Sequence, residues 1–234
     1  MTATNGERHG DLDRRNQAIQ HGADLLREGG PSALTSVAVA ERMGITQPAV
    51  YRHIRDVDEL AALASEVVVA DINASLRQLL LSPRIDWDHI DDIRWLCRSL
   101  IERMVAEQQA FTVVDRWRFD TSDLGAGIRA LLNEGRDLVA FLLESRWRIE
   151  WGYEGPLDHE QRTVLLTHAQ LIHDDGLAAA RLARTADNDS IRDDLGDVLR
   201  YRLIAEWASF VIDMNDRVGL PFPTIELDDR TFGE

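Results

Sequence analysis

The sequence predicts an all-α protein, with an N-terminal three-helix helix-turn-helix head and a C-terminal helical body. Apolar residues recur at spacings of three and four along most of the chain, and no stretch alternates between apolar and polar as a half-buried strand would. Glycine and proline divide this pattern into helix-sized segments. A length of 234 residues with 44% hydrophobic content is sufficient for a substantial core.

The stretch from Leu34 to Leu60 predicts the head. Thr35 is placed to cap a short helix, and Gly44 ends that helix because glycine adopts the left-handed conformation at little cost. The expected inward positions of this helix are Val37, Ala40 and Met43.

A second short helix is expected from Gln47 to Ile54. Thr46 is its candidate cap, and Pro48 suits a first turn, where a missing N–H costs nothing. Val50 and Ile54, four residues apart, should face inward. Asp56 and Glu59 have the spacing of a capping box that opens a third helix.

The exposed face of the second helix has the chemistry needed to read DNA. Gln47 and Arg52 can each make two hydrogen bonds to a base edge, whereas Tyr51 and His53 suit phosphate oxygens. The alternative is a surface helical hairpin in which Tyr51 packs and Arg52 is solvated. The residues predicted to contact DNA are Thr35, Gln47, Pro48, Ala49, Tyr51, Arg52 and His53.

The whole stretch resembles the DNA-binding domain of the TetR family of bacterial transcriptional regulators. The residues that carry the resemblance are Leu34-Thr35, Ala40 to Ile45, Pro48 to His53 and Asp58 to Leu60. The resemblance implies a homodimer that binds a palindromic operator in double-stranded DNA. It also implies a body that takes a small-molecule effector, and a linker helix that tilts when the effector binds. Val57 stands where many family members have a phosphate-binding lysine, and this chain contains no lysine.

Charge supports a division of the chain. Seven arginines and seven acidic residues cancel within residues 1–56, so the remaining nineteen arginines and thirty-four acids carry the net charge of −15. A neutral head on an acidic body predicts that DNA affinity depends on a few arginines. The expected units are a disordered arm (1–10), the DNA-binding domain (11–56), the effector-binding and dimerisation domain (57–219, with a linker helix at 57–81) and a tail (220–234).

Beyond the linker helix, every segment is predicted to be helical. Gly135 lies inside a long helical pattern, and the sequence does not decide whether it splits that helix. The expected segments are 88–108, 111–119, 121–151, 158–184 and 190–218.

Aromatic and polar residues in the middle helices suggest an effector pocket, since such pockets combine apolar walls with a few polar groups. The alternative is that these side chains form core. His168 and His173 are five residues apart and diverge on a helix, so neither a metal site nor a cofactor is predicted. The candidate effector-binding residues are Phe111, Trp117, Trp147, Trp151, His168 and His173.

The last two long helices carry the predicted dimer interface. An apolar stripe on the final helix and small residues on the preceding one would suit a four-helix contact between subunits. The alternative is that both stripes pack within one chain. The candidate interface residues are Ala179, Leu199, Leu203, Trp207 and Phe210.

The sequence therefore predicts a ligand-responsive transcriptional regulator, a repressor released from its operator by a small apolar or aromatic effector. Two alternatives remain: a DNA-binding regulator without a ligand, and a helical enzyme acting on a small molecule. The enzyme has little support, because no catalytic constellation or phosphate-binding loop is visible. The single Cys97 and the lack of a long apolar span predict a cytoplasmic protein with no membrane segment.

Overall fold

The computed structural model describes residues 5–185 and 189–221, and within them it is helical with no strand. This confirms the predicted fold class. The helices are α1 (Asn5–Gly29), a 3₁₀ turn η1 (Gly30–Ser32), α2 (Ser36–Met43), α3 (Gln47–Val50), α4 (Val57–Leu80), α5 (Ile90–Ala106), α6 (Gln108–Arg118), α7 (Asp123–Trp151), α8 (His159–Arg184) and α9 (Asp189–Val218).

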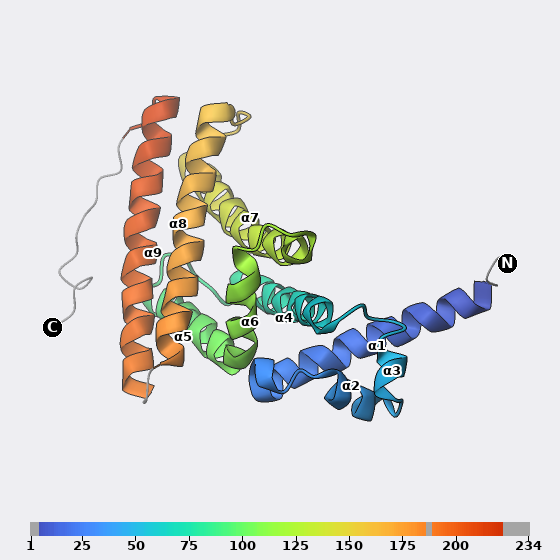
Figure 1. Cartoon of the computed structure of the whole chain (residues 1–234). Helices are drawn as coiled ribbons and strands as arrows, with labels where there is room; N and C mark the ends of the chain where they lie inside the picture. Colours follow the sequence, from blue (N-terminus) through green and yellow to red (C-terminus); the bar gives the residue numbers. More distant parts are fainter. Residues whose placement is uncertain (1–4, 186–188, 222–234) are drawn as a thin grey trace.

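Helices α1 to α3 form the head, which lies at the lower right of Figure 1. The Thr35 hydroxyl accepts the Ala38 N–H at 3.1 Å, as expected for the cap of α2. Gly44 ends α2 with a φ of 64°, in the left-handed region. Val50 and Ile54 are buried against the head core, as predicted. Local signals in the sequence therefore place the turn of the helix-turn-helix correctly.

Gly44 allows a prediction about stability. A Cβ added there would meet no atom within 4 Å, so Gly44→Ala should destabilise the fold by about 1 kcal/mol through backbone conformation alone. Gly176, inside α8, has equally open space, and Gly176→Ala should stabilise by up to about 1 kcal/mol because alanine favours helix. Denaturant midpoints at constant m-value measure both changes. Equal midpoints for the two variants would contradict this account.

The body is a bundle in which α8 and α9 run antiparallel as a long pair along one side (Figure 1). Helix α7 packs on α8, and α5 crosses both α8 and α9. Helix α4 lies between the head and the bundle, and contacts α1 on one side and α7 on the other. It is therefore the element that joins the two parts of the molecule.

The largest hydrophobic cluster does not stop at the head. It runs from Leu26 and Val39 through Leu60 and Val68 on α4 to Trp117 on α6. Gly22 of α1 permits the close approach of α4, since a Cβ there would lie 3.1 Å from Leu60 Cδ1. Two further clusters stabilise the body, one around Trp147 and one between α5, α8 and α9.

The structure answers the question that the sequence left open at Gly135: α7 is continuous and tolerates a single glycine without a second breaker. Several predicted details are wrong. Helix α1 begins at Asn5, within the segment expected to be a disordered arm. Thr46 makes no side-chain cap bond, and Val37 is 48% exposed because Val39 occupies the core instead.

Candidate functional site

The candidate DNA-reading surface is built on α2, α3 and the turn that follows α3. The predicted second helix, Gln47 to Ile54, is α-helical only as far as Val50. Beyond it, the N–H groups of His53 and Ile54 both donate to the Val50 carbonyl, at 2.9 and 3.0 Å. A tightened last turn is common at helix ends, and here it keeps Ile54 in the core.

Ser36 on α2 orients two of the predicted DNA-reading side chains. Its hydroxyl oxygen accepts a hydrogen bond from Gln47 Nε2 at 2.8 Å and another from Tyr51 Oη at 3.0 Å. Because Ser36 is buried, these bonds hold Gln47 and Tyr51 against α2 while both remain exposed. Sequence reasoning missed Ser36; its place directly after the Thr35 cap was the available signal.

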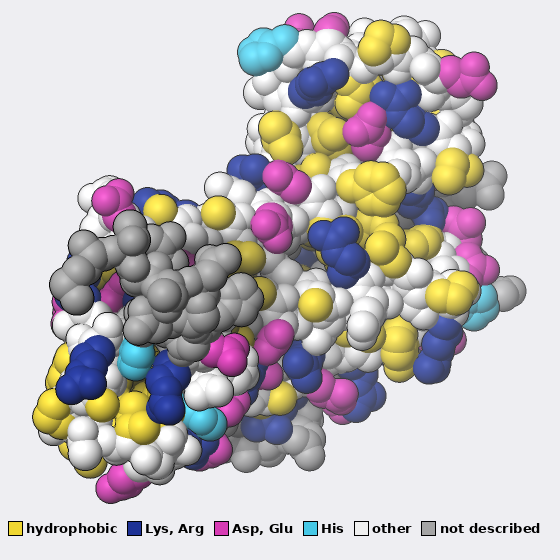
Figure 2. All heavy atoms as spheres, turned by 90° about the vertical axis from the view of Figure 1, so that its right-hand side faces the viewer, with side chains coloured by type: hydrophobic (Ala, Val, Ile, Leu, Met, Phe, Trp, Pro, Cys, Tyr) yellow, Lys and Arg dark blue, Asp and Glu magenta, His cyan; other side chains and the backbone are white. Residues whose placement is uncertain are grey.

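The remaining predicted DNA-reading residues lie on the same part of the surface. Thr35, Pro48 and Arg52 are exposed, and Ala49 and His53 are half-buried. Arg52 has no hydrogen bond or ion pair among the described residues, so its guanidinium is available to a ligand. At the height of the head, Figure 2 shows Arg and His side chains gathered with hydrophobic ones between them.

Two arginines of α1 connect the head to α4. Arg15 donates to the His53 carbonyl at 2.5 Å and to Glu59 Oε1 at 2.9 Å. Burial alone would raise the pKa of Glu59, but Arg15 and the Arg55 N–H hold it below its usual value. The Glu59 carboxylate accepts the N–H of Arg55, and therefore does not close the predicted capping box with Asp56.

The second arginine of α1, Arg27, donates to Asp71 of α4 at 2.5 Å and to Glu107 at 3.1 Å.

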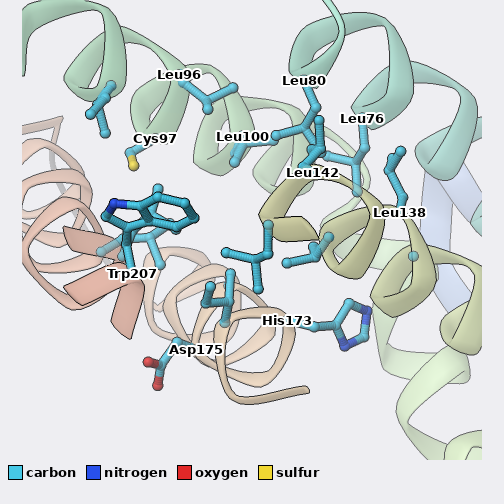
Figure 3. Close-up of a pocket in the computed structure, with 18 of the residues that line it drawn as sticks. Leu76, Leu80, Leu96, Cys97, Leu100, Leu138, Leu142, His173, Asp175 and Trp207 are labelled. Carbon is cyan, nitrogen blue, oxygen red and sulfur yellow. The ribbon is translucent and has the colours of Figure 1, made fainter. Parts of the chain in front are cut away.

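A cavity of about 800 Å³ opens between α4, α5, α7, α8 and α9. This volume is typical of small-molecule sites. Its wall is mostly aliphatic, with six leucines labelled around it in Figure 3: Leu76, Leu80, Leu96, Leu100, Leu138 and Leu142. Cys97 also lines it, and burial raises the pKa of this thiol to about 12, so it remains protonated.

Among the predicted effector-binding residues whose side chains the structure describes, only His173 lies on the cavity wall. Trp117 is buried in the cluster shared by head and body, and Trp151 packs in the cluster around Trp147. Trp147 is fully buried there, and donates from Nε1 to Asn215 Oδ1 at 2.8 Å. The side chain of Phe111 lies outside the described part. Two other tryptophans, Trp87 and Trp207, line the cavity instead.

His168 also lies outside the cavity wall, because it joins α8 to α9. Its two ring nitrogens lie 2.5 Å from Glu206 Oε1 and 3.0 Å from Asp213 Oδ2. These contacts occupy both polar atoms of the ring. His168 is therefore a structural link between the two long helices.

The predicted dimer residues pack within the chain. Ala179 and Leu199 are buried against α5, and Phe210 is fully buried in the cluster around Trp147. Leu203 and Trp207 line the cavity. The reason is that α9 carries apolar residues on two faces, and the predicted stripe is the inward one. Its outer face exposes Val198, Tyr201 and Ile212.

The described residues hold neither a metal-binding cluster nor a helix that could span a membrane. No group of three or more histidine, cysteine or acidic side chains is arranged to hold a metal ion. Within residues 5–185 and 189–221, no helix combines the length and the apolar content needed to cross a membrane.

Comparison with solved structures identifies this architecture. The chain superposes on E. coli NemR in its reduced form with a TM-score of 0.55 at 14% identity, covering 80% of this chain and 95% of that one. A putative TetR-family regulator from Mesorhizobium loti gives 0.55 at 14% identity, over 86% and 96% of the two chains. Thermus thermophilus FadR, a TetR-family repressor in complex with lauroyl-CoA, gives 0.51 at 17%, over 86% and 94%. The chain has the TetR-family fold.

A sequence relative supports the TetR resemblance. The class A tetracycline repressor from transposon 1721 of E. coli is 39% identical over 56 residues, which are 24% of this chain and 26% of that protein. The chain thus matches about a quarter of that relative's length. No protein-family model matches. At these identities, the likeness of the whole chain to the TetR-family structures is one of fold.

Proposed function

We propose that this TetR-type chain is a DNA-binding transcriptional regulator, a repressor that releases its operator when a small molecule occupies the cavity. The observation that carries the proposal is the course of α4. Its first turns pack on the head through Leu60 and Ala64, and its last turns line the cavity through Leu76 and Leu80. One rigid helix therefore contacts both sites.

Binding at the cavity can act on DNA only if the effector favours one of two dispositions of the head. A molecule wedged against Leu76 would move α4, and the Arg15–Glu59 and Arg27–Asp71 pairs would carry α1 with it. The head would then leave the position that suits the major groove. The cavity favours this mechanism over a regulator that has no ligand, and FadR is a repressor of the same fold with lauroyl-CoA bound.

A two-fold operator requires two heads, and we propose that the outer faces of α8 and α9 form the dimer interface. Arg202 of α9 pairs with Asp175 of α8 at 2.9 Å, and exposed apolar residues flank this pair. Homodimer interfaces are typically rich in such residues. The residues we assign to the interface are Leu171, Ala178, Leu182, Val198, Tyr201, Ala205 and Ile212.

A charge on the outer face of α9 should prevent dimer formation. Val198 is 57% exposed in the single chain, so Val198→Arg should fold normally but sediment as a monomer, because an unpaired charge would be buried at the interface. Phe119→Arg is the matched control, since Phe119 is more exposed and follows directly after the end of α6, outside the interface. A dimeric Val198→Arg protein would exclude this face.

The test of the DNA proposal is selection from a random double-stranded library with the purified protein at a stated salt concentration. We expect enriched sequences with two inverted half-sites about one helical turn apart, or a multiple of it. Binding without sequence enrichment would refute the proposed regulator.

A further inference from the structure

The cavity wall offers few counter-charges to an ionised ligand. In Figure 3, leucines from α4, α5 and α7 surround the space, with Trp207 and His173 at opposite sides. An ionised group placed against such a wall loses its hydration, and needs a counter-charge to compensate for this. The charged residues that border the cavity are therefore decisive.

Most of these charges are already paired. Arg146 donates to Asp88 at 2.5 Å and lies 3.8 Å from Glu150, and Asp175 is bonded by Arg202. The two charged residues on the wall that have no partner among the described residues are Arg77 and Glu134. Both are exposed, and both also line a smaller adjoining hollow. Because they are opposite in sign, together they add no net charge to the cavity wall.

His173 lies on this wall, and neither of its ring nitrogens makes a hydrogen bond within the described residues. Its Nδ1 is buried, with the nearest acidic oxygen, on Asp174, 4.0 Å away, so Nε2, which lies beside Gly135, is the ring atom that a ligand would meet. Burial lowers the pKa of His173, and Arg118 and Arg136 lower it further, while Asp174 opposes them. The ring is therefore neutral at neutral pH, with one donor and one acceptor.

A second polar group, the side-chain amide of Asn73, lies near this histidine, on the side where Gly135 has no side chain. A Cβ on Gly135 of α7 would lie 3.2 Å from His173 Nε2 and 3.3 Å from Asn73 Oδ1. The amide of Asn73 is held in place, because its Nδ2 donates to the Leu131 carbonyl at 2.7 Å. His173, Asn73 and Gly135, from three different helices, thus form one polar corner of an apolar cavity.

We propose that the ligand of this cavity is an uncharged, mainly hydrocarbon molecule with a single hydroxyl or carbonyl group, which is bound at the His173–Asn73 corner. The regulatory effect of this ligand rests on the proposed function, whereas its binding to the cavity does not. The proposal predicts that neutral molecules bind more tightly than carboxylates, acyl-coenzyme A thioesters and alkylammonium ions of similar chain length.

Three probes with the same ten-carbon chain test the charge requirement: 1-decanol, decanoate and decylammonium. Binding to the full-length protein, without DNA, is followed by calorimetry and by the fluorescence of Trp87 and Trp207, which line the cavity. We expect decanol to bind at least about tenfold more tightly than either ion, since burying an unpaired charge costs more than one hydrogen bond returns. Equal or tighter binding of either ion, or no binding of decanol, would overturn the assignment.

Variants at His173 test the polar corner. His173→Phe should weaken decanol binding about five- to tenfold, the loss expected for one hydrogen bond, and His173→Gln, which keeps a donor and an acceptor, should restore part of it. His159→Phe, at the exposed start of α8, is the matched control. Unchanged affinity in a folded His173→Phe protein would refute the role of this histidine. If decanol binds but leaves the operator complex intact, the proposed release mechanism fails and the ligand class stands.

Discussion

Arg52→Ala is expected to weaken binding to the selected operator about ten- to a hundredfold, while the protein remains folded and dimeric. A guanidinium that makes two hydrogen bonds to a guanine edge contributes about 1–3 kcal/mol of discrimination. Arg52 is exposed beside Tyr51, and no partner among the described residues would have to be displaced. Gel-shift titration at fixed salt measures the change. The loss should be largest for the correct operator, so sequence preference should also relax.

The control for Arg52→Ala is Arg98→Ala, which removes the same charge from α5 of the body. Tyr51→Phe tests the neighbouring contact more finely, because it removes the hydroxyl that bonds Ser36 and keeps the ring. Full operator affinity in Arg52→Ala would remove this residue from the recognition surface.

Trp147→Ala should destabilise the protein by about 3–5 kcal/mol, the usual cost of emptying a large buried aromatic site. Trp147 has no exposed surface, packs 4.9 Å from Tyr153 between ring centroids, and bonds Asn215. Trp147→Phe should cost about 1–3 kcal/mol, because the buried Asn215 Oδ1 loses its donor. Denaturant unfolding measures both changes.

Phe119→Ala is the stability control, because that side chain is 76% exposed and its loss should change the free energy of unfolding by less than about 0.5 kcal/mol. Trp147→Phe should also bind decanol as tightly as the unmodified protein, since Trp147 does not line the cavity. Loss of ligand affinity in a folded Trp147→Phe variant would show that Trp147 does contribute to the ligand site.

The sequence predicts the head better than the body for a physical reason. Helix caps and left-handed turns are determined by the local sequence. In the head these are made by Thr35, Gly44 and Asp56, each of which contacts residues no more than four positions away. An apolar stripe such as Leu199 to Phe210, in contrast, indicates that a helix face is buried without indicating the partner. Because α9 is apolar on two faces, the choice between core and dimer interface depended on residues far away in the chain.

The effector pocket illustrates the same limit. Trp117 and Trp147 suggested a ligand site because they are large and aromatic, but large side chains fill space and so become core. The cavity instead lies between five helices, and its wall is mostly aliphatic, with Trp87 and Trp207 as its tryptophans. His173 was predicted because such pockets combine apolar walls with a few polar groups, and the same reasoning selected His168, which lies outside the cavity wall. The space that packed helices leave between them has no comparable signal in the sequence.

The cluster that runs from α1 through α4 to α6 determines how this chain can be recombined with others. Leu60 and Ala64 belong to α4 in sequence, but they complete the core beneath Leu26 and Val39. A head excised at residue 56 would expose that core, and a chimera joined there would set a foreign α4 against it. Exchange of operator specificity between repressors of this fold should therefore succeed with a junction inside α4 beyond Val68. Alternatively, only the exposed side chains of α2 and α3 would be grafted.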